Sequence, residues 1–173
     1  MTELVRDLIP HAPQMGLYVA PEIPPDLLRN AVESFGEGAK PDAVLALFDN
    51  SIFGNARDGA LLTGDGIVFR KSGQVAHTVR YEDITHVDKK KGFFSKALNL
   101  DVNRGRATFT VTIDVSNNAE ALDYLHRFLQ EAMLQPSPVG TTDWEAVQQA
   151  LMALRSRGLL TREDYARLMR DFR

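Results

Sequence analysis

The sequence predicts an α+β fold in which a seven-stranded antiparallel barrel is closed by a helix that follows its last strand. Residues 107–114 alternate apolar and threonine side chains, which is typical of a strand with one buried face. Apolar residues then recur at helical spacing from Leu122 to Met133, which indicates a helix with one buried face. Asn117 and Asn118 are the candidate N-caps of this helix.

The composition is that of a globular protein with one ordinary domain and accessory segments. Of its 173 residues, 44% are hydrophobic and 25% are charged, which is a normal balance. The net charge of −3 argues against a dedicated nucleic-acid binder, because such domains are usually basic. The sequence has no cysteine, which excludes disulfides, thiolate zinc sites and cysteine nucleophiles.

The first residues do not fit a targeting segment. Glu3 and two early prolines are foreign to a signal peptide, and no apolar run approaches the ~18 residues of a membrane span. We therefore expect a cytoplasmic protein.

Residues 1–42 are expected to form an N-terminal arm and helix. Residues 2–9 suit about two helical turns capped by Thr2. Five prolines argue against regular structure across most of 10–25, while apolar residues there predict packing against the barrel. A second helix is predicted to begin at Pro25 and to end at Gly36.

Residues 43–134 are expected to form the barrel and its closing helix. The seven strands are predicted at 44–49, 59–63, 66–71, 74–81, 84–88, 96–102 and 107–114. The connections within 59–114 are short, which predicts antiparallel pairing of consecutive strands. Short strands protect their edges by curling into a barrel or a two-sheet sandwich, and the helix after the last strand fits over the open end.

A set of spaced motif residues lies within this region: Asp49, Ser51, Phe53, Gly54, Asp58, Gly59, Thr63, Gly66, Ile67, Tyr81, Asp83 and Ile84. Their spacing resembles that of a group of uncharacterised bacterial proteins with a pleckstrin-homology-like (PH-like) domain. The order of seven meandering strands and one helix resembles the same superfold. The resemblance covers roughly 25–133. It implies a fold and carries across no catalytic, metal or cofactor residue.

The C-terminal part is expected to consist of a linker at 135–142 and two short helices at 143–173. The pattern from Leu154 to Tyr165 is similar to the short C-terminal (SHOCT) helical hairpin of many bacterial proteins, which implies oligomerisation or interaction. About 30 residues cannot bury a core alone, so the hairpin needs the barrel, a sister chain or a partner. We predict a homo-oligomer formed partly through Trp144, Leu151, Leu154, Leu159, Tyr165, Leu168, Met169 and Phe172.

A basic and aromatic loop joins the fifth and sixth predicted strands, with Lys89, Lys90, Lys91, Phe93, Phe94 and Lys96. Such residues suit an anionic surface, either lipid headgroups or phosphates. The alternative is a solvated loop whose phenylalanines pack in the core or in a dimer interface. Specific inositol-phosphate recognition is not expected, because 49–58, the first hairpin loop, carries one arginine and two aspartates.

Patterns of catalytic and metal-binding residues are absent from the sequence. There is no Gly-x-Ser-x-Gly nucleophile motif, and His77, His86 and Asp83 lack metal-site spacing. We therefore expect no catalytic residue, metal or cofactor. The predicted function is a non-enzymatic cytosolic protein-interaction or scaffold module that binds an unknown protein partner. The first alternative is peripheral binding to anionic membranes through 89–96, followed by nucleic-acid binding and enzymatic activity.

Overall fold

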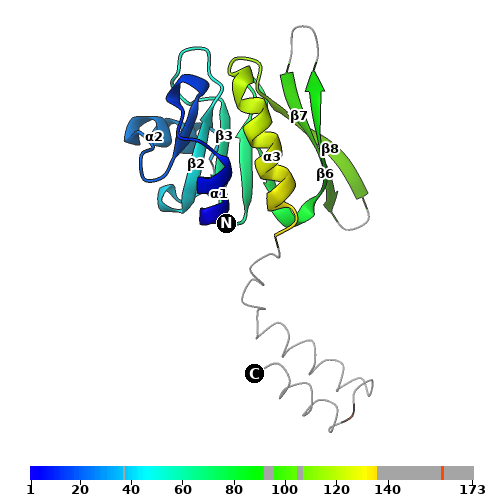
Figure 1. The fold of residues 1–173 in the computed structure, drawn as a ribbon. Coiled ribbons are helices and arrows are strands. Elements are labelled where there is room, and N and C mark those ends of the chain that lie inside the picture. Colours follow the sequence, from blue (N-terminus) through cyan, green and yellow to red (C-terminus); the bar gives the residue numbers. More distant parts are fainter. Residues whose placement is uncertain (37, 92–95, 105–106, 136–160, 162–173) are drawn as a thin grey trace. The chain divides into compact units, whose positions relative to one another are not determined.

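The computed structural model describes residues 1–36, 38–91, 96–104, 107–135 and 161. The chain divides into two units, Met1–Gln135 and Pro136–Arg173, and the helices and strands labelled in Figure 1 belong to the first. Trp144 and the seven other residues predicted to mediate self-association lie outside the described residues.

The strands form two antiparallel sheets. The five-stranded sheet has the order β1 (Leu17–Val19), β2 (Val44–Asp49), β3 (Gly59–Thr63), β4 (Gly66–Arg70) and β5 (His77–Arg80). The three-stranded sheet has the order β6 (Ile84–Lys91), β7 (Lys96–Arg104) and β8 (Ala107–Asp114). A 3₁₀ turn, Tyr81–Asp83, separates β5 from β6, and no strand pairing joins the two sheets in the described part of the chain. The expectation of one closed barrel is therefore not confirmed.

The seven predicted strands correspond to β2–β8, and β1 is an addition. The sequence predicts no regular structure in most of the proline-rich arm. This prediction was wrong at Leu17–Val19, which pairs antiparallel with Ala46–Phe48 of β2. The prolines of the arm flank this short strand and do not interrupt it. Leu17 and Ile23 are buried, so the arm packs against the rest of the unit, as predicted.

Three α-helices accompany the sheets: α1 (Thr2–Leu8), α2 (Pro25–Ser34) and α3 (Leu122–Ala132). Met1 is the N-cap of α1, so the prediction of a Thr2 cap was wrong. The predicted ends of α2 are confirmed. Pro25 occupies its first position, and the Gly36 N–H donates to the carbonyl oxygens of Ala31 and Val32.

The main core lies where α1 and α3 meet the sheets. The buried stripe of α3 consists of Leu122, Leu125, Phe128 and Leu129, as its spacing predicts. Figure 1 shows α1 and α3 close together, and α3 also contacts β6 and β7. On β8, Val111 and Ile113 are buried as predicted, whereas Phe109 is 38% exposed.

Tyr81 connects α3 to the five-stranded sheet. Its ring packs edge-to-face on Phe128, with centroids 5.6 Å apart, and its hydroxyl donates to the Thr63 carbonyl oxygen at 3.2 Å. Burial raises the pKa of Tyr81 far above its ordinary value, so the phenol remains a hydrogen-bond donor. Tyr81 therefore joins α3 and β3 at the point where the chain passes from one sheet to the other.

A second core cluster covers the other face of the five-stranded sheet. Phe35, at the end of α2, packs there with Leu47, Leu61 and Val68. Because both faces of β3 and β4 are covered, these strands are apolar at nearly every position, without the alternation seen in β8.

We predict that Phe128→Ala lowers the free energy of unfolding by about 3–5 kcal/mol, because it removes a fully buried ring and leaves a cavity. Urea denaturation followed by circular dichroism measures this change. Leu134→Ala, at an exposed position just after α3, is the control and is expected to cost less than about 0.5 kcal/mol. Equal losses in the two variants would contradict the assignment of the core to α3.

Candidate functional site

Three consecutive buried polar residues lie where β2 passes into the loop at 50–58: Asp49 ends β2, and Asn50 and Ser51 begin the loop. The Ser51 hydroxyl donates to Asp49 Oδ1 at 2.5 Å and accepts the N–H groups of Asn55 and Ala56 at 2.9 and 3.2 Å. The Ser51 N–H also donates to Asp49 Oδ1, at 2.8 Å. Burial of these groups is tolerated because they have hydrogen-bond partners, and the same bonds hold the loop in one conformation.

The same residues attach the loop to the segment between β8 and α3. Asn50 Oδ1 accepts the N–H groups of Asn117 and Asn118 at 3.1 and 3.3 Å. The side-chain amide of Asn117 donates to the Asn50 carbonyl oxygen, and that of Asn118 to the Asp49 carbonyl oxygen, both at 2.6 Å. Asn118 occupies the N-cap position of the 3₁₀ turn that leads into α3, so the predicted capping position is confirmed, but both asparagine side chains bind Asp49 and Asn50 instead of capping the helix. Neither the 3₁₀ turn Ala119–Ala121 nor α3 has a side-chain cap.

Backbone conformation at three positions allows this arrangement. Gly16 has φ +69°, and a Cβ there would lie 2.2 Å from the Asp49 carbonyl oxygen. Gly59 has φ +138°, and a Cβ there would lie 1.9 Å from the Phe48 carbonyl oxygen. Both positions therefore require glycine. Ala56 has φ +54°, which is rare for a residue with a side chain, and the Ser51 bond to its N–H supports it.

The loop exposes two large apolar side chains at its tip. Ile52 is 79% exposed and Phe53 is 87% exposed, although they follow the buried Ser51 directly. Asn30 of α2 supports the loop from the far side by donating to the Asn55 carbonyl oxygen at 3.1 Å. We call Ile52 and Phe53 the loop tip. They are an exposed apolar pair on a loop whose first residues are held by the hydrogen bonds of Ser51 and Asp49.

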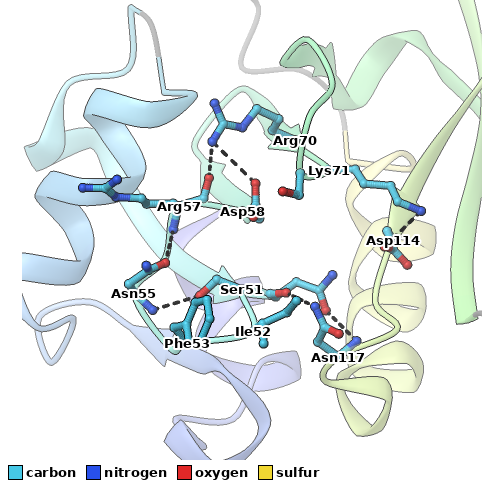
Figure 2. A pocket seen from close by; sticks show the side chains of 12 residues that line it. Ser51, Ile52, Phe53, Asn55, Arg57, Asp58, Arg70, Lys71, Asp114 and Asn117 are labelled. Atoms are coloured by element: carbon cyan, nitrogen blue, oxygen red, sulfur yellow. Dashed lines mark hydrogen bonds and ion pairs between the residues drawn. The ribbon is translucent and has the colours of Figure 1, made fainter.

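A pocket of about 440 Å³, here called the first pocket, lies beside the loop tip. Figure 2 shows Ile52 and Phe53 on one side of it and Arg70 and Lys71 on the other. Its remaining lining residues are Asn50, Ser51, Asn55, Arg57, Asp58, Ser72, Asp114 and Asn117.

Arg70 holds one wall of the first pocket. Its guanidinium donates to the carbonyl oxygens of Ser34 at 2.7 Å and Arg57 at 2.5 Å, and lies 3.5 Å from Asp58 Oδ1. It also lies over the Phe35 ring, 5.8 Å from its centroid. Its Nε is buried without a hydrogen-bond partner among the described residues. Arg70 therefore holds the loop through the backbone carbonyl group of Arg57, while the Arg57 side chain remains exposed.

A second pocket, of about 200 Å³, adjoins the first, because Lys71 and Asp114 line both. Lys71 Nζ lies 3.3 Å from Asp114 Oδ2, and Lys90 is a further lining residue. Strand register places Lys90 opposite Ala97, and Ala97 opposite Asp114, so the three residues share one face of the sheet. The sequence places Lys71 and Lys90 in separate segments, and only the packing of the sheets brings them together.

The lysines of the predicted basic loop do not share one face, because Lys89 and Lys90 are neighbours in β6 and successive side chains of a strand point to opposite faces. Lys89 Nζ lies 2.9 Å from Asp123 Oδ1 of α3, whereas its neighbour Lys90 lies on the opposite face and is exposed. Lys96 is also exposed. Phe93, Phe94 and the Lys91 side chain lie outside the described residues. The described lysines thus do not form one cluster.

Most of the motif residues quoted above have structural roles. Asp49 and Ser51 hold the loop, and the Thr63 hydroxyl donates to the Gly66 carbonyl oxygen at 3.0 Å in the β3–β4 turn. Phe53 differs from these residues because its side chain is exposed. The first pocket is not predictable from the sequence, since its cations at 57, 70 and 71 have no shared spacing there.

No group of three or more histidine, cysteine or acidic residues positioned to hold a metal ion occurs among the described residues. Within the same residues, no helix has the length and apolar character needed to span a membrane. Comparisons with protein-family models, curated proteins and solved structures find no match to this chain.

We predict that Ser51→Ala lowers the free energy of unfolding by about 1–3 kcal/mol, because the amides of Asn55 and Ala56 lose their acceptor. Those two amides are also expected to exchange hydrogen faster than in the unmodified protein. Urea denaturation and hydrogen exchange measure the two effects. The matched control is Ser72→Ala, an exposed serine of the same pocket, which is expected to change neither. Unchanged exchange in Ser51→Ala would refute this role of the hydroxyl.

Proposed function

We propose that this chain is a non-enzymatic cytosolic protein-interaction module with a PH-like fold, which binds a protein partner through the loop tip. The single observation that carries the proposal is the exposure of Ile52 and Phe53 on a loop whose base is buried and hydrogen-bonded. Covering each side chain in an interface would contribute up to about 1.5–3 kcal/mol. Because the loop is already ordered, little of that gain is lost to ordering on binding.

The residues around the tip support a protein partner. Aromatic and arginine side chains are enriched in protein interfaces, and Phe53 lies beside a pocket lined by Arg57 and Arg70. The proposal assigns no catalytic residue, metal or cofactor, and it does not involve nucleic acid.

The order of the elements supports the PH-like assignment. Strands β2–β8 follow one another as the seven strands of the resemblance, and α3 comes directly after the last of them. In this proposal, β1 and the arm are an addition at the edge of the five-stranded sheet.

Self-association through 143–173 is the second part of the proposal. It is supported by the sequence, in which the apolar residues of the hairpin need a surface to cover them. We predict that the full chain is larger than a monomer in light scattering at about 100 µM and that a 1–135 variant is monomeric. Phe53→Ser in the full chain is the control and should leave the mass unchanged. A monomeric full chain would refute this part of the proposal.

Anionic-membrane binding through Lys89–Lys96 is the alternative function. Exposed lysines contribute about 1 kcal/mol each at an anionic surface, and Lys89 is already paired with Asp123. We therefore predict no preference for phosphatidylserine vesicles over phosphatidylcholine vesicles in co-sedimentation at low salt. A preference that Lys90→Glu and Lys96→Glu abolish, and that Lys40→Glu leaves intact, would favour the membrane function instead.

A further inference from the structure

We propose that the two adjoining pockets bind an acidic peptide segment of the partner that also carries a large apolar side chain. This inference rests on the proposed function of the loop tip. The apolar side chain would pack against Ile52 and Phe53, while the carboxylates would lie along Arg57, Lys71 and Lys90.

The charges of the two pockets favour an acidic ligand. The carboxylates that line them are already paired, Asp58 with Arg70 at 3.5 Å and Asp114 with Lys71 at 3.3 Å. In the second pair the Lys71 side chain is 51% exposed and the Asp114 side chain 15%, so the cation faces the solvent.

Two cations beyond those pairs complete the positive surface. Arg57 and Lys90 are both exposed, one in each pocket. The surface offered to a ligand is therefore positive, which favours negatively charged partners and speeds their association.

The order of residues along the pockets favours an extended segment over a single small anion. The loop tip lies at the first pocket, Lys71 and Asp114 line both pockets, and Lys90 lines the second. A ligand that reaches from the tip to Lys90 needs an apolar group at one end and carboxylates along the rest. An acidic peptide with an aromatic residue has this chemistry.

The same geometry favours a peptide over a membrane or a nucleic acid. The cations line two adjoining hollows, whereas the amphipathic elements that lie in a membrane interface present an apolar face flanked by cations. Asp58 and Asp114 interrupt the row of cations, so its positive charge is not continuous as a phosphate backbone would require. A peptide can space its carboxylates to avoid them.

The test uses the full chain and a fluorescein-labelled peptide, Gly-Asp-Phe-Asp-Glu-Phe-Asp-Glu-Gly, with binding measured by fluorescence anisotropy. We expect at least about tenfold tighter binding than for peptides with lysine in place of the acids or serine in place of phenylalanine. Binding should weaken as salt is raised, because exposed ion pairs are screened.

Charge-reversal variants locate the binding site. Arg57→Glu and Lys90→Glu are each expected to weaken binding of the acidic peptide at least about fivefold. Lys40→Glu, which makes the same change at an exposed lysine outside both pockets, should leave binding unchanged. All three positions are exposed, and thermal unfolding checks that the variants are folded. Equal effects of all three variants, or equal binding of all three peptides, would overturn the proposal.

Two further arms separate this inference from the function on which it rests. The first arm uses a neutral peptide with glutamine in place of the acidic residues. If this peptide binds as tightly as the acidic one, and Phe53→Ser abolishes its binding, the acidic preference is overturned and the loop tip is retained as a docking site. Binding of no peptide by the unmodified chain would overturn the acidic-peptide proposal alone, because a folded protein surface can still cover the loop tip. Binding to phosphatidylserine vesicles that Arg57→Glu abolishes, without peptide binding, would assign the pockets to a membrane.

Discussion

The hydrogen bonds between the end of β2 and the segment before α3 are the constraint on which the rest of the structure depends. The side-chain amide of Asn117 donates to the Asn50 carbonyl oxygen, and that of Asn118 donates to the Asp49 carbonyl oxygen. Asn50 Oδ1 accepts the backbone N–H groups of both asparagines. These bonds are part-buried, so water competes with them less than on an open surface. They join the end of β2, in the five-stranded sheet, to the segment between β8 and α3.

The apolar core and the polar contacts contribute differently. Burial of the α3 stripe in the main core stabilises the fold, because hydrophobic burial is large and non-directional. It does not by itself select how the loop at 50–58 is oriented. Ser51 and Asp49 make that selection, since hydrogen bonds require particular distances and angles. The result is a loop that keeps Ile52 and Phe53 exposed.

The pockets follow from the division into two sheets. Arg70 ends β4 in one sheet and Lys71 follows it directly, while Lys90 and Asp114 belong to the other sheet. Side chains from both sheets therefore line one surface, with the loop tip at its edge. The strand alternation that directs Lys90 to this surface also directs Lys89 to α3.

The sequence by itself determined strands β2–β8 and the three α-helices of this unit, but not β1. The alternation of 107–114, the turns between the strands and the helical spacing of Leu122–Leu129 are local patterns, and local patterns are sufficient to predict strands and helices. Tertiary structure alone decided the pairing of Leu17–Val19 with β2, the bonds of Asn117 and Asn118 to Asn50 and Asp49, and the shared surface of Lys71 and Lys90. Each of these joins residues far apart in the chain. An asparagine before a helix suits a cap and a distant carbonyl equally well, so only the packed fold selects between them.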